Sequence, residues 1–154
     1  MTPPGDFQDK IIRIHFRTKV KCMEIKISAG NARVPITIIH IKGSVDSATY
    51  QAFQAKADEL IRDGARYILV DLTETPFVSS AGLRVLHNIF NQLRSIHKDL
   101  NDDELRKKMS DGGYKSPHLK VTNLSSQVKD AFVISGFDTY IEIHDDVKKA
   151  VASF

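Results

Sequence analysis

Residues 71–86 read DLTETPFVSSAGLRVL, and this stretch decides how the chain folds. The apolar run Tyr67–Val70 that leads into it is typical of a short strand, and the residues after Gly82 have the apolar spacing of an amphipathic helix. We therefore predict a strand, a turn that carries Ser79 and Ser80, and a helix. A hydroxyl at this point lies at the positive end of the helix dipole, beside free backbone N–H groups. Such a place favours added negative charge and suits a switch operated by phosphate.

The composition indicates one soluble domain. The chain has 154 residues, of which 42% are hydrophobic and 27% charged, with a net charge of +3. No apolar run approaches the roughly 18–20 residues of a membrane span, and no secretory signal is visible, so we expect a cytoplasmic protein without direct membrane insertion. The single cysteine, Cys22, excludes an internal disulfide. The basic residues are spread along the chain, which argues against a nucleic-acid partner.

Strand and helix patterns alternate through most of the chain. Gly43–Ser47 reads as a loop that opens a helix, and Asp63-Gly64 ends that helix. Ser125 or Ser126 is expected to cap a later helix, which Gly136 closes. The alternation predicts an α/β fold: a mostly parallel, mixed sheet of four to six strands with about four helices packed on one face. Strands are expected at residues 23–28, 34–42, 67–71, 119–122 and 140–143, and a last helix at 145–152.

Two segments stand outside this pattern. Residues 1–22 are predicted to be an N-terminal extension or an extra strand: Met1–Asp9 has the composition of a disordered segment, whereas Ile12, Ile14 and Phe16 alternate with polar residues. The main domain would then span 23–154. Residues 98–117 form a polar insertion. Within it, Asn101 and Glu104 are spaced as a capping pair for a short helix that Gly112-Gly113 would stop.

The motifs together resemble the signature of the STAS domain family. The match consists of Asp71-Leu72-Thr73, the segment Phe77–Leu86 with its Ser-Ala-Gly-Leu core, and the upstream loop Gly43-Ser44-Val45-Asp46. The resemblance covers roughly residues 23–152, with 98–117 as extra length. It implies a small STAS-type α/β domain.

Stand-alone members of this family are anti-sigma factor antagonists, so the resemblance implies a bacterial regulator of transcription that works by partner switching. The unphosphorylated antagonist binds an anti-sigma factor that is also a serine kinase, and thereby frees a sigma factor. The kinase phosphorylates a serine at the start of the second long helix, and a serine phosphatase resets the switch. No cofactor is implied, and the protein would be a monomer or weak homodimer.

Carried over residue by residue, the motif places the phosphoacceptor at Ser80, with Ser79 as the alternative. Ser79 stands where sporulation-type members often carry Asp. The residues expected to bind the partner are Asp46, Ser79, Ser80, Ala81, Gly82 and Arg84. A phosphoserine carries about −1.5 to −2 charges. We expect it to act mainly by blocking the interface, with added repulsion from Asp46 and Glu74 if they lie near.

Less specific interpretations stay open beside these. Ser79, Ser80 and Asp46 could simply cap helices, and Thr73 and Thr75 could be ordinary turn residues. Gly82 is interpreted as structural, giving a close approach between helix and sheet.

Enzymatic and metal chemistry find little support in the sequence. The six histidines show no metal-ligand spacing. A triad of Ser80, a histidine and Asp71 can be imagined, but the nucleophile-elbow pattern is absent because residue 78 is Val. We therefore expect no catalytic residues and no metal site. The alternative functions are a scaffold subunit of a stress-signalling assembly, which would sediment as a large particle, and a STAS subunit of a membrane transport complex. The 98–117 insertion is hypothesised to set partner choice.

Overall fold

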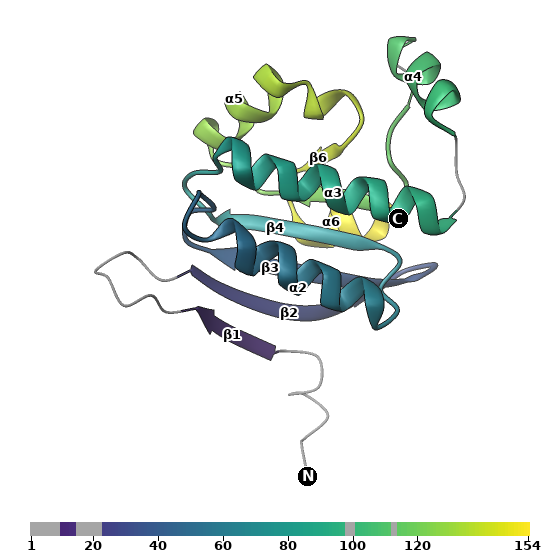
Figure 1. Ribbon diagram of the computed structural model, residues 1–154. Coiled ribbons are helices and arrows are strands. Elements are labelled where there is room, and N and C mark those ends of the chain that lie inside the picture. The colour runs from purple at the N-terminus through teal and green to yellow at the C-terminus, as the bar shows by residue number, and fades with distance from the viewer. Residues whose placement is uncertain (1–9, 15–22, 98–100, 112–113) are drawn as a thin grey trace.

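A computed structural model of the chain describes residues 10–14, 23–97, 101–111 and 114–154. Its centre is one mixed sheet whose strands follow the chain order β1-β2-β3-β4-β5-β6 (Figure 1). The first three strands are antiparallel neighbours, and β3 to β6 run parallel. The strand bounds are β1 Lys10–Ile14, β2 Met23–Asn31, β3 Pro35–Lys42, β4 Ile68–Glu74, β5 Leu119–Thr122 and β6 Glu142–His144.

Four helices share one hydrophobic core with one face of the sheet. The two long ones, α2 (Tyr50–Arg62) and α3 (Ser80–His97), lie side by side across the strands (Figure 1). Two shorter helices, α4 (Asp102–Ser110) and α5 (Ser126–Ser135), contribute Leu105 and Phe132 to the same core. The 3₁₀ turn η1 (Phe137–Thr139) follows α5.

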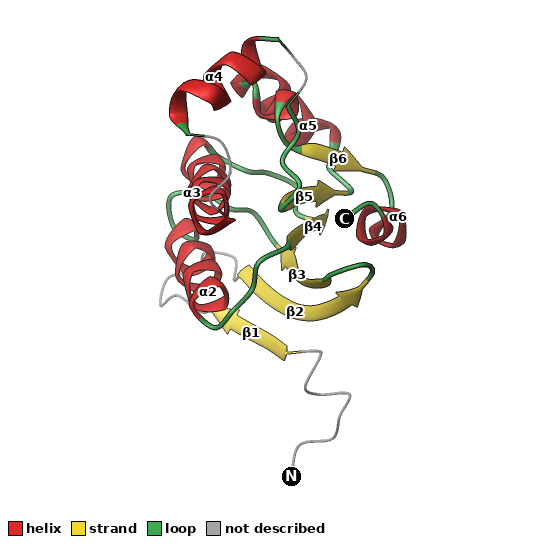
Figure 2. Cartoon of the chain, turned by 90° about the vertical axis from the view of Figure 1, so that its right-hand side faces the viewer, coloured by secondary structure: helices red, strands yellow, loops and turns green. Residues whose placement is uncertain are grey.

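The last helix, α6 (Val147–Ala152), packs on the opposite face of the sheet (Figure 2). There Ala150 and Phe154 cover Ile36, Ile38 and Leu69 in a second, smaller hydrophobic cluster. The predicted α/β fold class is confirmed, but the prediction that the helices lie on one face is wrong for α6. The physical reason lies in β3 and β4, which carry apolar residues in both alternating sets of positions. Ile36, Ile38 and Leu69 belong to the smaller cluster, and Ile39, Ile41 and Val70 belong to the main core. Apolar side chains therefore emerge on both faces, and both faces need a cover.

Most predicted elements are present with shifted ends. The β2 strand extends to Asn31, β4 begins at Ile68 and continues to Glu74, and the last strand is Glu142–His144 in place of 140–143. The insertion does hold a helix, α4. Its capping box is formed: Asn101 Oδ1 accepts from Glu104 N at 2.8 Å, and Glu104 Oε1 accepts from Asn101 N at 3.4 Å.

The extension contributes an extra strand, because β1 pairs antiparallel with β2 from Lys10↔Ile27 to Ile14↔Met23. The expectations for Met1–Asp9, Phe16, Cys22 and Gly112-Gly113 lie outside the described residues.

Candidate functional site

The end of β4 is tied to the neighbouring strand before the chain turns into α3. The Thr75 side chain is 1% exposed, and its hydroxyl donates to Ile41 O at 2.7 Å. Thr75 N also donates to Leu72 O at 3.1 Å, which closes a tight turn. Thr75 is therefore a structural turn residue, and the segment that follows starts from a fixed point.

Two loops far apart in the sequence meet directly before α3. Val45 N donates to Phe77 O at 3.0 Å, and Ser79 N donates to Val45 O at 2.8 Å. The two bonds form a short parallel bridge between Val45 and Val78. The Gly43–Ser47 loop and the serine pair, which the sequence motifs grouped together, thus belong to one platform.

Gly82 allows this platform to close. A Cβ atom at residue 82 would lie 2.7 Å from Val78 Cγ1 and 2.8 Å from Val45 Cγ1. Real carbon atoms do not approach so closely, so any side chain here would push α3 away from both loops. The predicted structural role of Gly82 is confirmed, and the contact it permits is with the two loops at the end of the sheet.

The two serines have different environments. Ser79 is half-buried; its Oγ accepts from Gly82 N at 3.4 Å, and its carbonyl accepts from Leu83 N at 2.9 Å. Ser79 is thus the N-cap of α3. Ser80 is the first residue of the helix and its side chain is exposed.

Asp46 has a local capping role. Its Oδ1 accepts from Ala48 N at 2.9 Å and from Thr49 Oγ1 at 3.3 Å, and its carbonyl accepts from Tyr50 N at 2.9 Å. The residue therefore organises the turn that leads into α2 while remaining half-buried beside the platform. Glu74 lies at the other edge, where its carbonyl accepts from Gly43 N at 2.9 Å.

A groove begins at Ser80 and runs between α3 and the end of α5. From α3 it is lined by Ser80, Leu83, Arg84 and His87. The opposite wall consists of Ser135, Phe137 and Tyr140. Arg84 is exposed, one turn after Ser80 on the same side of the helix, whereas Ala81 is half-buried. The predicted residues Asp46, Ser79, Ser80, Gly82 and Arg84 are therefore brought together around the start of α3.

Sequence reasoning missed the contribution of α5 and η1. A signal was present: Val133 and Ile134 fall outside the apolar stripe of α5, and they are 54% and 86% exposed. Phe77, two residues before Ser79, is 45% exposed. Large apolar side chains left exposed are candidates for contact with a partner when they form a contiguous patch.

Two titratable groups meet in the groove. His87 Nδ1 lies 3.2 Å from Tyr140 Oη, and the His87 ring stacks on Phe137. Burial and the charge of Arg94 lower the pKa of His87, and burial raises the pKa of Tyr140 to about 12. Both side chains are therefore neutral at pH 7, and each can donate or accept one hydrogen bond.

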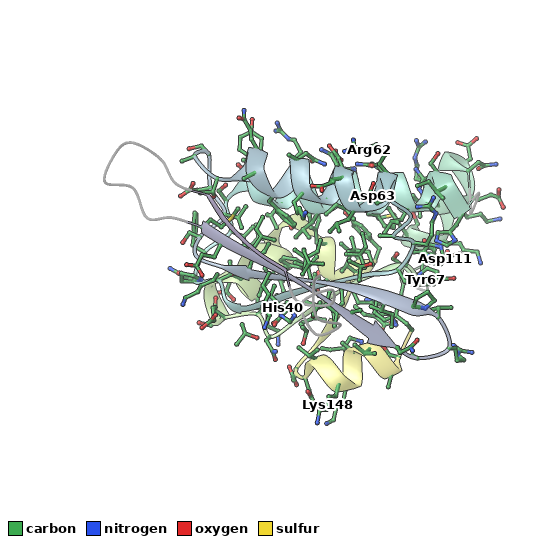
Figure 3. The ribbon with its side chains drawn as sticks, turned by 90° about the horizontal axis from the view of Figure 1, so that it is seen from below. His40, Arg62, Asp63, Tyr67, Asp111 and Lys148 are labelled. Carbon is green, nitrogen blue, oxygen red and sulfur yellow. The ribbon has the colours of Figure 1, made fainter. Side chains whose placement is uncertain are left out.

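Asp71, from the same motif, bonds to His40, which Figure 3 labels, in a row of hydrogen-bonded side chains. Strand alternation puts Asp71 on the same face as Leu69, the face that α6 covers. His40 Nδ1 lies 2.6 Å from Asp71 Oδ2, and His40 Nε2 lies 2.7 Å from Ser28 Oγ. Thr73 donates to Asp71 Oδ1 through both its N–H and its hydroxyl. Burial by itself would raise the pKa of Asp71, but these hydrogen bonds outweigh it and lower the pKa below its ordinary value of 3.8.

These hydrogen bonds between Ser28, His40 and Asp71 connect β2, β3 and β4. The histidine bonded to Asp71 is His40, and the next hydroxyl is that of Ser28, so the imagined triad with Ser80 is not formed. Within the described ranges, no cluster of three or more His, Cys, Asp or Glu residues is arranged to hold a metal ion. None of the helices in these ranges has the length and apolar character needed to cross a bilayer.

Comparison with known proteins identifies the class. Residues 27–100 match the model of the STAS domain family. This range contains the Gly43–Ser47 loop, the 71–86 segment and all of α3. This part of the chain is therefore similar to a STAS domain, as the sequence motifs indicated.

Anti-sigma factor antagonists are among the proteins that this chain is similar to. BtrV of Bordetella bronchiseptica, described provisionally as such an antagonist, is 29% identical over 114 residues, which cover 74% of this chain and 82% of that protein. An anti-sigma factor antagonist from Mycobacterium paratuberculosis has the same fold, with a TM-score of 0.61 at 15% identity, covering 84% of this chain and 92% of the other.

The fold is also that of the Bacillus protein SpoIIAA in its phosphorylated form, with a TM-score of 0.54 at 15% identity over 81% of this chain and 96% of SpoIIAA. At 15% sequence identity, the similarity to these two solved structures is evidence for a shared fold and not for a shared role.

Proposed function

We propose that this protein is an anti-sigma factor antagonist that is switched off by phosphorylation of Ser80. It binds an anti-sigma factor that is also a serine kinase, and a sigma factor is released as a result. The kinase then phosphorylates Ser80 and the complex dissociates, until a serine phosphatase restores the free hydroxyl. The observation that carries the proposal is an exposed hydroxyl at the first residue of α3, on a platform fixed by the Val45–Val78 bridge.

The environments of the two serines favour Ser80 over Ser79 as the acceptor. The Ser79 hydroxyl is half-buried and bonded to Gly82 N, so a kinase would have to break the N-cap to reach it. The Ser80 hydroxyl is exposed and can enter a kinase active site without a change in the fold.

Phosphate on Ser80 is compatible with the folded domain but not with a partner packed against it. The positive end of α3 stabilises a nearby negative charge, and Arg84, four residues later on the same side, can pair with it. A partner that covers the free Ser80 hydroxyl would meet, after phosphorylation, a dianion that loses its water on binding. A loss of about 3 kcal/mol at the interface weakens binding about a hundredfold.

The other predicted residues have distinct roles in this proposal. Asp46 and Ser79 shape the surface through their caps, and Gly82 holds α3 against the loops. Ala81 and Arg84 contact the partner directly beside Ser80. The protein acts by binding, and its similarity to BtrV supports a regulatory role over an enzymatic one.

The test is incubation with candidate anti-sigma kinases and ATP, followed by peptide mass mapping. We expect one phosphate, on Ser80, and none on the Ser80→Ala variant. Ser79→Ala is the matched control, because it removes a neighbouring hydroxyl and leaves the acceptor in place.

The binding test is the Ser80→Asp variant, measured by calorimetry against the same kinase. We expect at least tenfold weaker binding than wild type. Phosphate on Thr73 or Ser79, or wild-type affinity of Ser80→Asp, would show the proposal to be wrong.

A further inference from the structure

A second groove continues the surface that starts at Ser80. It lies between the middle of α3 and the insertion helix α4, and it is lined by His87, Asn91, Arg94, Leu105, Arg106 and Met109. His87 lines both grooves, so the two adjoin at this residue of α3. Figure 1 shows α5 over the N-terminal half of α3 and α4 over its C-terminal half, and we call the outward side of α3 between them the α3 surface.

The insertion is a packed part of the domain, and the second groove therefore has a defined shape. Leu105 is 9% exposed and belongs to the main core. After the helix, Tyr114 is equally buried and packs edge-on against Phe90, with ring centroids 6.2 Å apart. The capping box of Asn101 and Glu104 fixes where α4 begins.

The α3 surface has one sign of charge. Among the described residues that line the two grooves, every formally charged one is an arginine: Arg84, Arg94 and Arg106. The acidic residues of α4 that the structure describes, Asp103 and Glu104, line neither groove. Apolar side chains, among them Met109 and Phe137, line the same two grooves. A surface of this kind is complementary to an apolar segment with acidic residues along its edges.

We propose that α4 extends the partner-binding surface and that the whole α3 surface binds an acidic, partly apolar segment of the anti-sigma factor, an inference that rests on the proposed function. One end of that segment covers Ser80, and the other contacts Arg106 on the insertion. Phosphorylation then acts twice: it places a dianion under the partner, and it engages Arg84, which the acidic segment would otherwise use. A STAS domain without the insertion lacks the second groove, so α4 restricts the choice of partner.

The test compares two charge reversals on the same helix. Arg106→Glu changes a groove residue, whereas Lys107→Glu makes the same change in charge at an exposed residue that lines neither groove. Binding of each variant to the kinase that phosphorylates Ser80 is measured by calorimetry at low and at moderate salt. Circular dichroism checks that both variants keep the wild-type fold.

We expect Arg106→Glu to bind about tenfold more weakly than wild type, with a smaller loss of affinity on adding salt. Lys107→Glu should stay within about twofold. Equal affinities of the two variants would overturn the inference, even when Ser80→Asp abolishes binding and the proposed function stands.

If Arg106→Glu weakens binding while Ser80→Asp does not, the surface is supported and the Ser80 switch is wrong. Competition by a short DNA duplex at physiological salt would show that the occupant is a nucleic acid and not an acidic protein segment.

Discussion

Replacing Gly82 by alanine tests whether the platform depends on close contact between α3 and the two loops. The added Cβ would lie 2.7 Å from Val78 Cγ1 and 2.8 Å from Val45 Cγ1, and 3.1 Å from Val45 Cβ. Both valines are buried: Val45 is 0% exposed and Val78 is 3% exposed. Their β-branched side chains also have few alternative rotamers. The loops or the first turn of α3 must therefore move.

Two opposing free energies decide the result. Alanine is preferred to glycine inside a helix by about 0.5–1 kcal/mol. Forcing an extra methyl group into a well-packed region costs about 1–3 kcal/mol. Because the clash involves two side chains at once, we expect the upper part of that range, and a net destabilisation of about 1–2 kcal/mol. Binding to the kinase should also weaken, since Ser80 moves with the helix.

Urea denaturation followed by circular dichroism measures the change. We expect a lower midpoint with an unchanged m-value. The control is Ser80→Ala, an exposed change in the same helical turn that should leave stability within about 0.5 kcal/mol. The double variant Gly82→Ala/Val78→Ala removes the nearest clashing atom, so its cost should be smaller than the sum of the two single changes. A Gly82→Ala protein at least as stable as wild type would refute the reasoning.

Two further predictions concern the other face of the sheet. Asp71→Asn should destabilise the fold by about 1–3 kcal/mol at pH 7, because a buried charged hydrogen bond is lost. The folded-state pKa of Asp71 lies below 3.8, so the stability that its carboxylate contributes is present above that pH and is lost as the pH falls through the folded-state pKa. The difference in stability between wild type and Asp71→Asn should therefore shrink in acid. Urea titrations at several pH values would measure it. Phe154→Ala removes the largest side chain of the cluster under α6 and should lower the free energy of unfolding by about 3 kcal/mol or more. Thermal unfolding measures this change. An unchanged stability would mean that this face is not covered as described.

Much of the fold could be predicted because it depends on local patterns. The apolar period of α3, the cap at Ser125 and the capping box at Asn101 are each encoded within a few residues, and the structure contains all three. The place of α6 could not be predicted in this way, because its partners on β3 and β4 are distant in sequence. The apolar residues of β3 are consistent with a buried strand, but they do not say which element covers each face.

The sequence by itself determined the strand-turn-helix at 71–86 and the two hydroxyls at the start of α3, because strand, cap and helix are set by residue types over short distances. The motif favoured Ser80 as the acceptor, and the tertiary structure supplied the physical difference between the two serines. The Ser79 hydroxyl accepts a hydrogen bond as the N-cap of α3, whereas Ser80 is exposed. The bond from Ser79 N to Val45 O and the absence of a side chain at Gly82 hold α3 against the loops in this position. The grooves on either side of His87 are likewise tertiary. Their opposite walls come from α4, and from the end of α5 with η1 and Tyr140, which fold back onto α3 and bury their own apolar sides.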